Sequence, residues 1–312
     1  MKKLAIASAI AASVAAPCFA ADQIGAAMMA FDNQFISLIR SAIDKQATES
    51  KLTVQFEDAQ MDVVRQADQV KNLINGNNKG IIVNPIDATA TKAITAAAQK
   101  AKIPLVYVNN KPTEPLPATG VAFVGSDERE AGKLQMQEVC RLLKGKGKLM
   151  ILMGGLSFQQ TRFRTEAAEE VLKTPECSGI KVEDKQAGDW SRISGNNIVS
   201  NWITAGLKPD AIIANNDEMA LGAIQALDAA KIPVGVGKDK VVVAGIDATQ
   251  DALASIKDGK MAASVFQDAK GQGAGAVIAI DKMIKGQPVK PEIFIPFELV
   301  TPANADSYAN RY

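Results

Sequence analysis

Polar side chains that can hydrogen-bond a hydroxylated molecule follow an apolar run in the middle of this sequence. Asn215 and Asn216 come directly after Ala211–Ala214, which has the composition of a buried strand. Asp217 then stands where a helix N-cap is expected, because an apolar helical face follows it. An asparagine amide both donates and accepts hydrogen bonds, which suits a neutral polyol. A turn that only joins a strand to a helix has the same composition, so both interpretations stay open for this segment alone.

The same pattern recurs at the ends of other predicted strands. The amides and carboxylates at these places are Asp32, Asn33, Asn109, Asn110, Asp247 and Gln267. Carboxyl ends of parallel strands meet at one edge of a sheet, which is where α/β proteins bind ligands. Buried polar groups are costly unless they are paired. A ligand with many hydroxyl groups would explain why so many of them gather there.

Two aromatic residues and one arginine extend this candidate site. Phe31 and Trp190 can each cover the C–H face of a sugar ring, while amides and carboxylates bind its edge. Arg164 is a rigid donor of several hydrogen bonds. The alternatives are a packing role for the tryptophan and a solvated surface position for the arginine.

Several kinds of chemistry have no support in the sequence. The chain contains no histidine, which excludes Ser-His-Asp and Cys-His catalytic arrangements. Lys144–Lys148 has the wrong glycine spacing for a phosphate-binding loop. Cysteine spacing predicts no metal site, and no cofactor is expected. Cys140 and Cys177 are predicted to lie on different helices as separate thiols.

Composition and the N-terminus indicate an exported globular protein. The chain has 312 residues and a formal net charge of +1, so no strong field attracts nucleic acid, and no nucleic-acid partner is expected. Residues 1–20 have the pattern of a signal peptide, with Lys2 and Lys3 before an apolar run and a cleavage site after Ala20. The run is too short to span a bilayer. The predicted location of the mature chain is the periplasm.

Strand-like runs alternate with amphipathic segments, which predicts parallel sheets covered by helices. The predicted strands are Ile24–Met29, Leu52–Phe56, Gly80–Val83, Leu105–Val108, Val121–Val124, Leu149–Met153, Ile180–Asp184, Ala211–Ala214, Val241–Ile246, Ala263–Phe266 and Glu292–Ile295. The clearest predicted helices are Phe35–Ser50, Asp62–Asn75 and Gly273–Ile284. The Pro-rich stretch Lys111–Gly120 interrupts the alternation and indicates two lobes. An eight-stranded barrel is the structural alternative, although about ten strands fit it poorly.

The segments Asn216–Gly222, Val243–Asp247 and Phe266–Asp268 resemble the periplasmic sugar-binding proteins of the ribose-binding type, which serve ATP-driven importers. The resemblance covers nearly the whole chain after residue 20. It implies two Rossmann-like lobes joined by three crossovers, with the ligand in the cleft between them. It assigns residues 21–125 and 268–295 to the first lobe, and residues 126–267 and 296–312 to the second.

By the same resemblance, each candidate residue has a role in binding. Phe31 and Trp190 would stack on a sugar ring. The residues that would bind hydroxyl groups are Asp32, Asn33, Asn109, Arg164, Asn216, Asp247 and Gln267. An Asp-Arg pair usual in pentose binders is replaced here by Asn109 and Asn110. The segments Tyr107–Asn109, Gly188–Arg192 and Phe266–Gly273 are more similar to the branch that binds inositol and rhizopines.

The expected function is therefore capture of a cyclic polyol, best matched by myo-inositol, and delivery to an ABC permease. The expected form is a monomer, and a chemoreceptor is a further possible partner. A binder of ribose or xylose is the nearest alternative. Two alternatives from other classes are a sugar-responsive transcription regulator and an enzyme that uses Asp32, Asp247 and Glu218 as acid and base.

Overall fold

The computed structural model describes residues 21–311. The predicted signal peptide, residues 1–20, lies outside this part of the chain, so its cleavage stays a prediction. Within residues 21–311, each helix is too short or too polar to cross a membrane.

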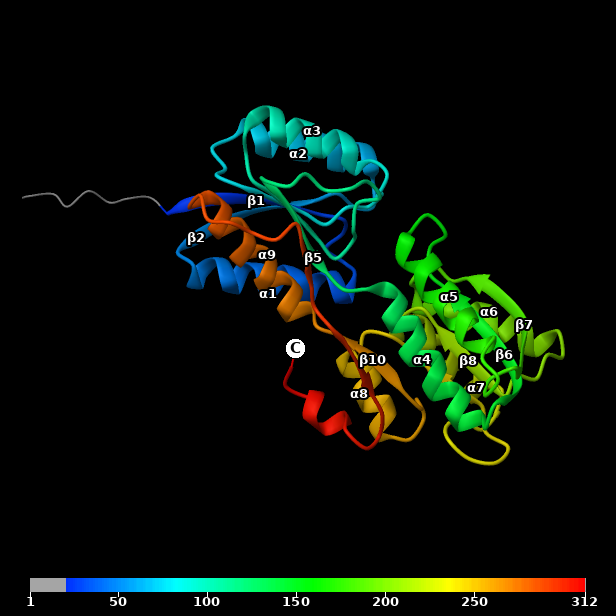
Figure 1. Ribbon diagram of the computed structural model, residues 1–312. Helices are drawn as coiled ribbons and strands as arrows, with labels where there is room; N and C mark the ends of the chain where they lie inside the picture. Colours follow the sequence, from blue (N-terminus) through cyan, green and yellow to red (C-terminus); the bar gives the residue numbers. More distant parts are fainter. Residues whose placement is uncertain (1–20, 312) are drawn as a thin grey trace, which may run out of the picture.

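The first lobe is built on a six-stranded sheet whose neighbouring strands are all parallel, in the order β11-β5-β4-β3-β1-β2. Its strands are β1 (Asp22–Met28), β2 (Leu52–Asp58), β3 (Ile81–Val83), β4 (Leu105–Val108), β5 (Val121–Gly125) and β11 (Glu292–Phe294). Helices α2 (Val63–Asn75) and α3 (Thr91–Ala101) cover one face, and α1 (Gln34–Glu49) and α9 (Ala269–Ile284) cover the other (Figure 1). Strands β3, β4 and β5 are buried throughout, as expected for a sheet covered on both faces.

The second lobe has a four-stranded parallel sheet in the order β7-β6-β8-β9. The strands are β6 (Lys146–Met153), β7 (Gly179–Ala187), β8 (Ala211–Ala214) and β9 (Val242–Ala244). Its helices are α4 (Glu128–Leu143), α5 (Gln159–Leu172), α6 (Arg192–Thr204), α7 (Asp217–Ala229) and α8 (Gln250–Lys257). One apolar cluster lies on the side of α6, α7 and α8, and another lies beneath α4 and α5. The structure thus has two α/β lobes with parallel sheets, as the sequence predicts.

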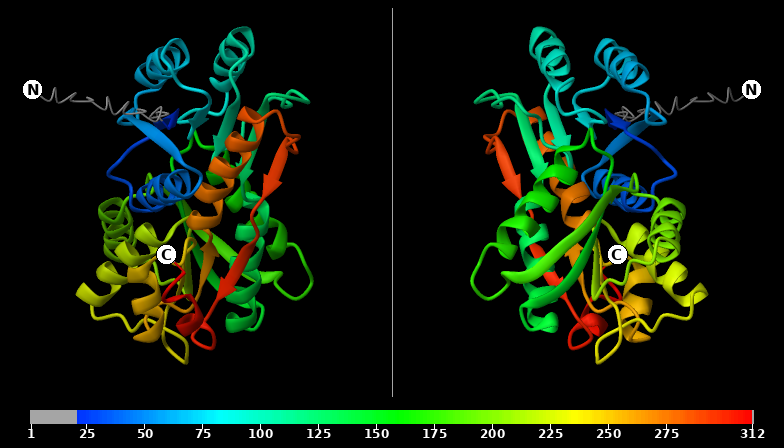
Figure 2. Two further views of the ribbon diagram at one scale, coloured as in Figure 1. Left: turned by 90° about the vertical axis from the view of Figure 1, so that its left-hand side faces the viewer. Right: turned by 90° about the vertical axis from the view of Figure 1, so that its right-hand side faces the viewer.

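Three chain segments connect the lobes. The first follows β5 at Ser126, and the second follows β10 (Ser264–Gln267) and leads into α9. The third joins β11 to β12 (Phe297–Val300), and Figure 2 shows it passing from one lobe to the other. Strands β10 and β12 pair antiparallel as a separate two-stranded sheet. α9 and β11 lie with the first sheet, and the residue boundaries of the two lobes stay a prediction.

The prediction for the cysteines was wrong. Cys140 lies near the end of α4, and Cys177 lies in the turn after α5 instead of on a helix. The two residues form a disulfide, with their Cα atoms 5.7 Å apart. Helices α4 and α5 pack side by side, and this tertiary contact brings the turn after α5 to the end of α4. No local sequence pattern records that contact.

Candidate functional site

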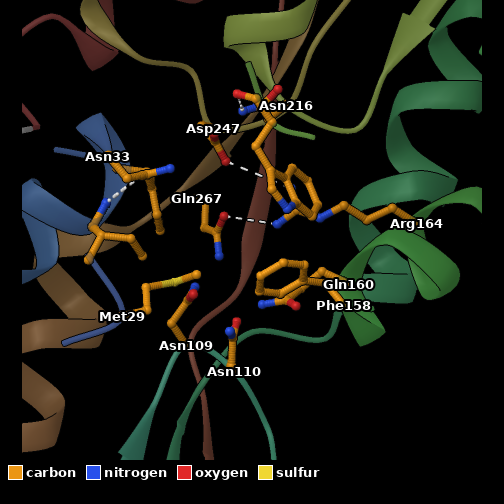
Figure 3. A pocket seen from close by; sticks show the side chains of 13 residues that line it. Met29, Asn33, Asn109, Asn110, Phe158, Gln160, Arg164, Asn216, Asp247 and Gln267 are labelled. Atoms are coloured by element: carbon orange, nitrogen blue, oxygen red, sulfur yellow. Dashed lines mark hydrogen bonds and ion pairs between the residues drawn. The ribbon is translucent and has the colours of Figure 1, made fainter. Parts of the chain in front are cut away.

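A cavity of about 60 Å³ lies between the two lobes. From the first lobe it is lined by Met29, Asn33, Phe35, Ile36, Asn109 and Asn110, and from the second by Phe158, Gln160, Arg164, Trp190, Asn216, Asp247 and Gln267. Figure 3 shows these side chains pointing toward one another from both lobes. A volume near 10–15 Å³ by the same measure holds one water, so the cavity has room for a small molecule.

Seven of the nine residues predicted for the site line this cavity, and Phe31 and Asp32 do not. The Phe31 ring lies 4.1 Å from the guanidinium carbon of Arg40, and Asp32 is exposed to solvent. The aromatic surface of the cavity comes instead from Phe35 and Phe158 beside Trp190. The roles of the seven predicted residues in binding a ligand remain a prediction.

Five further residues line the cavity without having been predicted for the site: Met29, Phe35, Ile36, Phe158 and Gln160. A signal for Phe158 was present, because Gly154–Phe158 follows β6 in the way that other cavity loops follow their strands. Phe35 begins the helix predicted over Phe35–Ser50, and both Phe35 and Ile36 lie in the first turn of α1.

Two cavity-lining asparagines cap helices that begin at the cavity. Asn33 Oδ1 accepts a hydrogen bond from the backbone N–H of Ile36 at the start of α1 (3.0 Å). Asn216 Oδ1 accepts one from Met219 at the start of α7 (3.1 Å), while its Nδ2 donates to the Trp190 carbonyl (3.1 Å). Both N-caps have extended backbone, as this capping geometry requires. The positive ends of two helix dipoles therefore point toward the cavity.

The prediction that Asp217 caps α7 was wrong. Asn216 occupies the extended N-cap position, so Asp217 is the first helical residue. Its buried carboxylate accepts hydrogen bonds from Ser264 Oγ (2.6 Å) and from the Thr249 backbone N–H (2.8 Å). Asp217 thus joins α7 to the segments around β10 and α8.

Asn215 holds the loops behind the cavity in place. Its Oδ1 accepts hydrogen bonds from the Gly154 backbone N–H (3.0 Å) and from Thr165 Oγ1 (3.2 Å). Its carbonyl oxygen accepts a hydrogen bond from Arg164 Nη1 (2.6 Å). The side chain does not line the cavity, and its role is to position those that do.

Arg164 is the central cation of the site and is almost fully buried. Its Nε donates to Glu128 Oε2 (2.6 Å), and its Nη2 donates to Gln267 Oε1 (3.0 Å). Asp247 Oδ1 lies 3.9 Å from Nη1. Several fixed acceptors hold the guanidinium plane, which leaves its orientation little freedom.

The acids around Arg164 have raised pKa values. Burial raises the pKa of Asp247 well above its ordinary value, and Arg164 opposes that shift. Burial also raises the pKa of Glu128, again against the effect of Arg164. The pKa of Asp217 is raised to about 7 by burial, although hydrogen bonds from Ser264 and Thr249 favour the charged form. Burial thus favours the neutral forms of all three carboxyl groups.

Backbone conformation at the cavity is unusual. Asn109, Trp190 and Asp247 have φ values of 67°, 63° and 119°, in the region that favours glycine. Trp190 lies edge-on to Phe158 with ring centroids 5.9 Å apart. A Cβ atom at Gly154 would lie 2.2 Å from the Trp190 ring, so only glycine fits behind it. Strained conformations of this kind concentrate at functional sites.

The acidic groups that the enzyme alternative requires are not gathered at the cavity. Asp32 and Glu218, which the enzyme alternative requires, do not line the cavity, and Glu218 is held by Arg192 at 2.8 Å. Among residues 21–311, no cluster of three or more His, Cys, Asp or Glu side chains is arranged to hold a metal ion. What the cavity offers is amide, carboxylate and guanidinium groups around three aromatic rings.

Two lobes of parallel sheet with a polar cavity between them are the architecture expected of periplasmic binding proteins, and the sequence comparison agrees. Residues 24–288 match the model of the periplasmic binding protein domain. The chain belongs to the periplasmic binding protein family.

Individual relatives cover almost the whole chain. A Rhizobium meliloti protein proposed to bind rhizopine is 46% identical over 316 residues, which span all of both chains. The ribose import binding protein of Salmonella typhimurium is 30% identical over 303 residues, 96% of this chain and 98% of that one. A solved ABC transporter solute-binding protein from Bacillus halodurans, with bound myo-inositol, is 37% identical with a TM-score of 0.86, and covers 93% of this chain and 98% of its own.

Proposed function

We propose that this chain is the solute-binding component of an ABC importer and that it binds a cyclic polyol, with myo-inositol as the ligand. The observation that carries the proposal is the cavity between the lobes, in which amides, carboxylates and Arg164 surround aromatic rings. That combination suits a ring with an apolar C–H face and hydroxyl groups around its edge. The relatives whose names refer to rhizopine and myo-inositol support the choice of a cyclitol.

The mechanism is closure of the lobes around the ligand. Asn33 and Asn109 contact it from the first lobe, and Arg164, Asn216 and Asp247 contact it from the second. Contacts from both sides exist only when the lobes are closed, so the ligand stabilises the closed state. The closed form then docks on a permease in the membrane. The protein acts in the periplasm as a monomer after residues 1–20 are removed, and the closed form also suits recognition by a chemoreceptor.

Asn110 supports a ligand that carries hydroxyl groups. Its Nδ2 donates to the Pro85 carbonyl at 2.5 Å, and its buried Oδ1 has no hydrogen-bond partner among the described residues. A ligand hydroxyl group would supply the missing donor, because a buried acceptor without a partner is costly. Ribose or xylose is the second candidate, and the ribose-binding relative supports it.

The proposal includes binding without turnover. An enzyme would change the ligand, and a transcription regulator would need a DNA-binding segment that the sequence does not suggest. Recovery of myo-inositol after long incubation with the protein distinguishes the first case. Unchanged myo-inositol agrees with a binding protein, and a new product contradicts it.

A thermal-shift screen tests the proposed ligand class. A ligand that binds only the folded protein stabilises it by about 2.7 kcal/mol at 100 times its Kd. We expect myo-inositol to raise Tm more than ribose, xylose or galactose does. A larger shift with ribose would favour the second candidate, and no shift with any of the four would contradict the sugar or polyol class.

A further inference from the structure

Gln272 is a fully buried glutamine. It links the cavity to the hinge segment at Ser126, which is the first of the three connections between the lobes. Asn109 Nδ2 donates a hydrogen bond to Gln272 Oε1 (3.2 Å), and Gln272 Nε2 donates to Ser126 Oγ (3.1 Å). Asn109 lines the cavity, whereas Gln272 and Ser126 do not. One side chain therefore connects a cavity residue to a residue outside the cavity.

The three residues lie at places that matter for closure. Ser126 directly follows β5, where the chain leaves the first sheet for the second lobe. Gln272 lies in the first turn of α9, just after the chain returns through β10. The Gln272 side chain thus links Ser126, in the first connection between the lobes, to α9, the helix that follows the second connection.

Helix α9 gives this bridge a fixed base. A Cβ atom at the neighbouring Gly273 would lie 2.6 Å from the Ile39 carbonyl oxygen and 2.7 Å from Ala42 Cβ, so α9 is pressed against α1. The helix cannot move when the lobes open without breaking that contact. A change in the backbone at Ser126 therefore alters the Ser126–Gln272 hydrogen bond, and through it the hold on Asn109.

We propose that Gln272 is a positioning residue that couples the Asn109 amide to the hinge segment at Ser126, so that the hinge conformation sets how well Asn109 binds ligand. The role in affinity rests on the proposed function as a solute-binding protein. In this structure both hydrogen bonds are made, and Asn109 is held at the cavity. When opening breaks the Ser126 bond, the Gln272 amide loses a partner and Asn109 loses its fixed support.

The first test is a double-mutant cycle, in which the affinity of each variant for myo-inositol is measured by calorimetry. Gln272→Met keeps the approximate volume and removes both hydrogen bonds, and Ser126→Ala removes only the hinge partner. We expect each change to weaken binding by roughly three- to tenfold, the scale of one hydrogen bond. The double variant should bind no more weakly than Gln272→Met, because both changes interrupt the same connection.

Gln66→Met is the matched control. Gln66 is also a buried glutamine, and both of its hydrogen bonds, to the Asn84 carbonyl and from the Ile86 N–H, lie within the first lobe. This variant should lower Tm and weaken binding less than Gln272→Met does, because Gln66 is connected to the cavity only indirectly, through the loop at Pro85 that holds Asn110. Additive effects of Gln272→Met and Ser126→Ala, an unchanged affinity in Ser126→Ala, or an equal loss in Gln66→Met would overturn the proposal.

Small-angle X-ray scattering without ligand separates this proposal from the proposed function. Gln272→Met and Ser126→Ala should shift the radius of gyration in the same direction, with no further shift in the double variant and none in Gln66→Met. If the unmodified protein binds no myo-inositol, the proposed ligand is wrong. The radii of gyration of the variants still test whether Gln272 is coupled to Ser126. An unchanged radius of gyration in both single variants would refute that coupling.

Discussion

We propose that Asn33 and Asn216 each perform two tasks with one side chain, capping a helix and binding the ligand. The Oδ1 atom of each caps a helix, which leaves the Nδ2 group of Asn33 to act as a donor at the cavity. Asn216 Nδ2 also binds the Trp190 carbonyl, so this residue supports the aromatic wall as well. Capping and ligand binding can therefore be separated by substitutions that keep only the cap.

Asn33→Ser is the first such substitution. Serine caps helices about as well as asparagine, so Tm should change little. Affinity for myo-inositol should fall roughly three- to tenfold, because the shorter side chain lacks the amide donor. Asp62→Ser at the exposed N-cap of α2 is the control, and it should leave affinity unchanged. A Tm loss with unchanged affinity in Asn33→Ser would show that the residue is only a cap.

Trp190 gives a spectroscopic test, because the chain has only two tryptophans. Trp202 is buried on α6 and donates a hydrogen bond from Nε1 to Asp184. Ligand should change the fluorescence of Trp202→Phe, in which Trp190 is the remaining tryptophan, and not that of Trp190→Phe. Trp190→Ala should weaken binding by about 1–3 kcal/mol, the scale of burying a large apolar side chain. Equal affinity in Trp190→Ala would remove it from the site.

Among the site residues, the sequence predicted the polar residues at strand ends better than it predicted which aromatic residue faces the cavity. Strand ends place Asn109, Asp247 and Gln267 together, because parallel strands share one edge. Phe31 and Phe158 both follow strands, and only the loop conformation decides that Phe158 turns inward while Phe31 lies beside Arg40. Phe158 packs in an apolar cluster with residues far away in the sequence, and the sequence pattern does not contain such contacts.

At the scale of elements, the contact between α4 and α5 positions the arginine of the site. A Cβ atom at Gly132 on α4 would lie 2.1 Å from the Arg164 carbonyl oxygen on α5. Glycine at this position lets the two helices approach closely. The approach brings Glu128 of α4 within 2.6 Å of the Arg164 guanidinium.

Gly132→Ala should therefore separate α4 from α5. We expect a loss of about 1–3 kcal/mol in the free energy of unfolding, the usual cost of overpacking. Affinity should also fall, because Arg164 moves with α5. Gly76→Ala at the end of α2 is the control, since its nearest atom would be 3.3 Å from the added Cβ. Chemical denaturation and calorimetry check both quantities, and undiminished affinity in a folded Gly132→Ala protein would contradict this role.

Elements with a clear period were predictable, and those that depend on distant partners were not. The alternation of apolar runs and amphipathic segments predicts strands such as β4 and helices such as α1. Strand β12 was missed, because its short segment gains strand structure only by pairing with β10. The Cys140–Cys177 disulfide likewise depends on the packing of α4 against α5.

At the scale of the whole molecule, the buried acids link folding to pH. Asp217 has an ordinary pKa of 3.8 and a pKa of about 7 in the folded chain. The folded state therefore binds more protons than the unfolded state between these values. The resulting stabilisation is fully present below about pH 4 and is lost as the pH rises through about 7. Asp247 and Glu128 act in the same direction.

Asp217 should thus make the free energy of unfolding of the ligand-free protein decrease as the pH rises from 4 to 7. One proton contributes up to about 1.4 kcal/mol per pH unit. Asp217→Asn cannot ionise, so its stability should fall less steeply over this range than that of the unmodified protein. Urea denaturation at several pH values measures both slopes. Identical slopes in the two proteins would show that Asp217 is already ionised at low pH.

The central claim is that the cleft binds a cyclic polyol, and calorimetric titration of residues 21–312 with myo-inositol tests it most directly. We predict saturable binding at one site, at least about tenfold tighter than that of ribose or xylose, which corresponds to about 1.4 kcal/mol. The same titration with Arg164→Ala should show strongly reduced affinity, because this change removes the guanidinium group from the site. No heat of binding with myo-inositol, or tighter binding of ribose, would contradict the account.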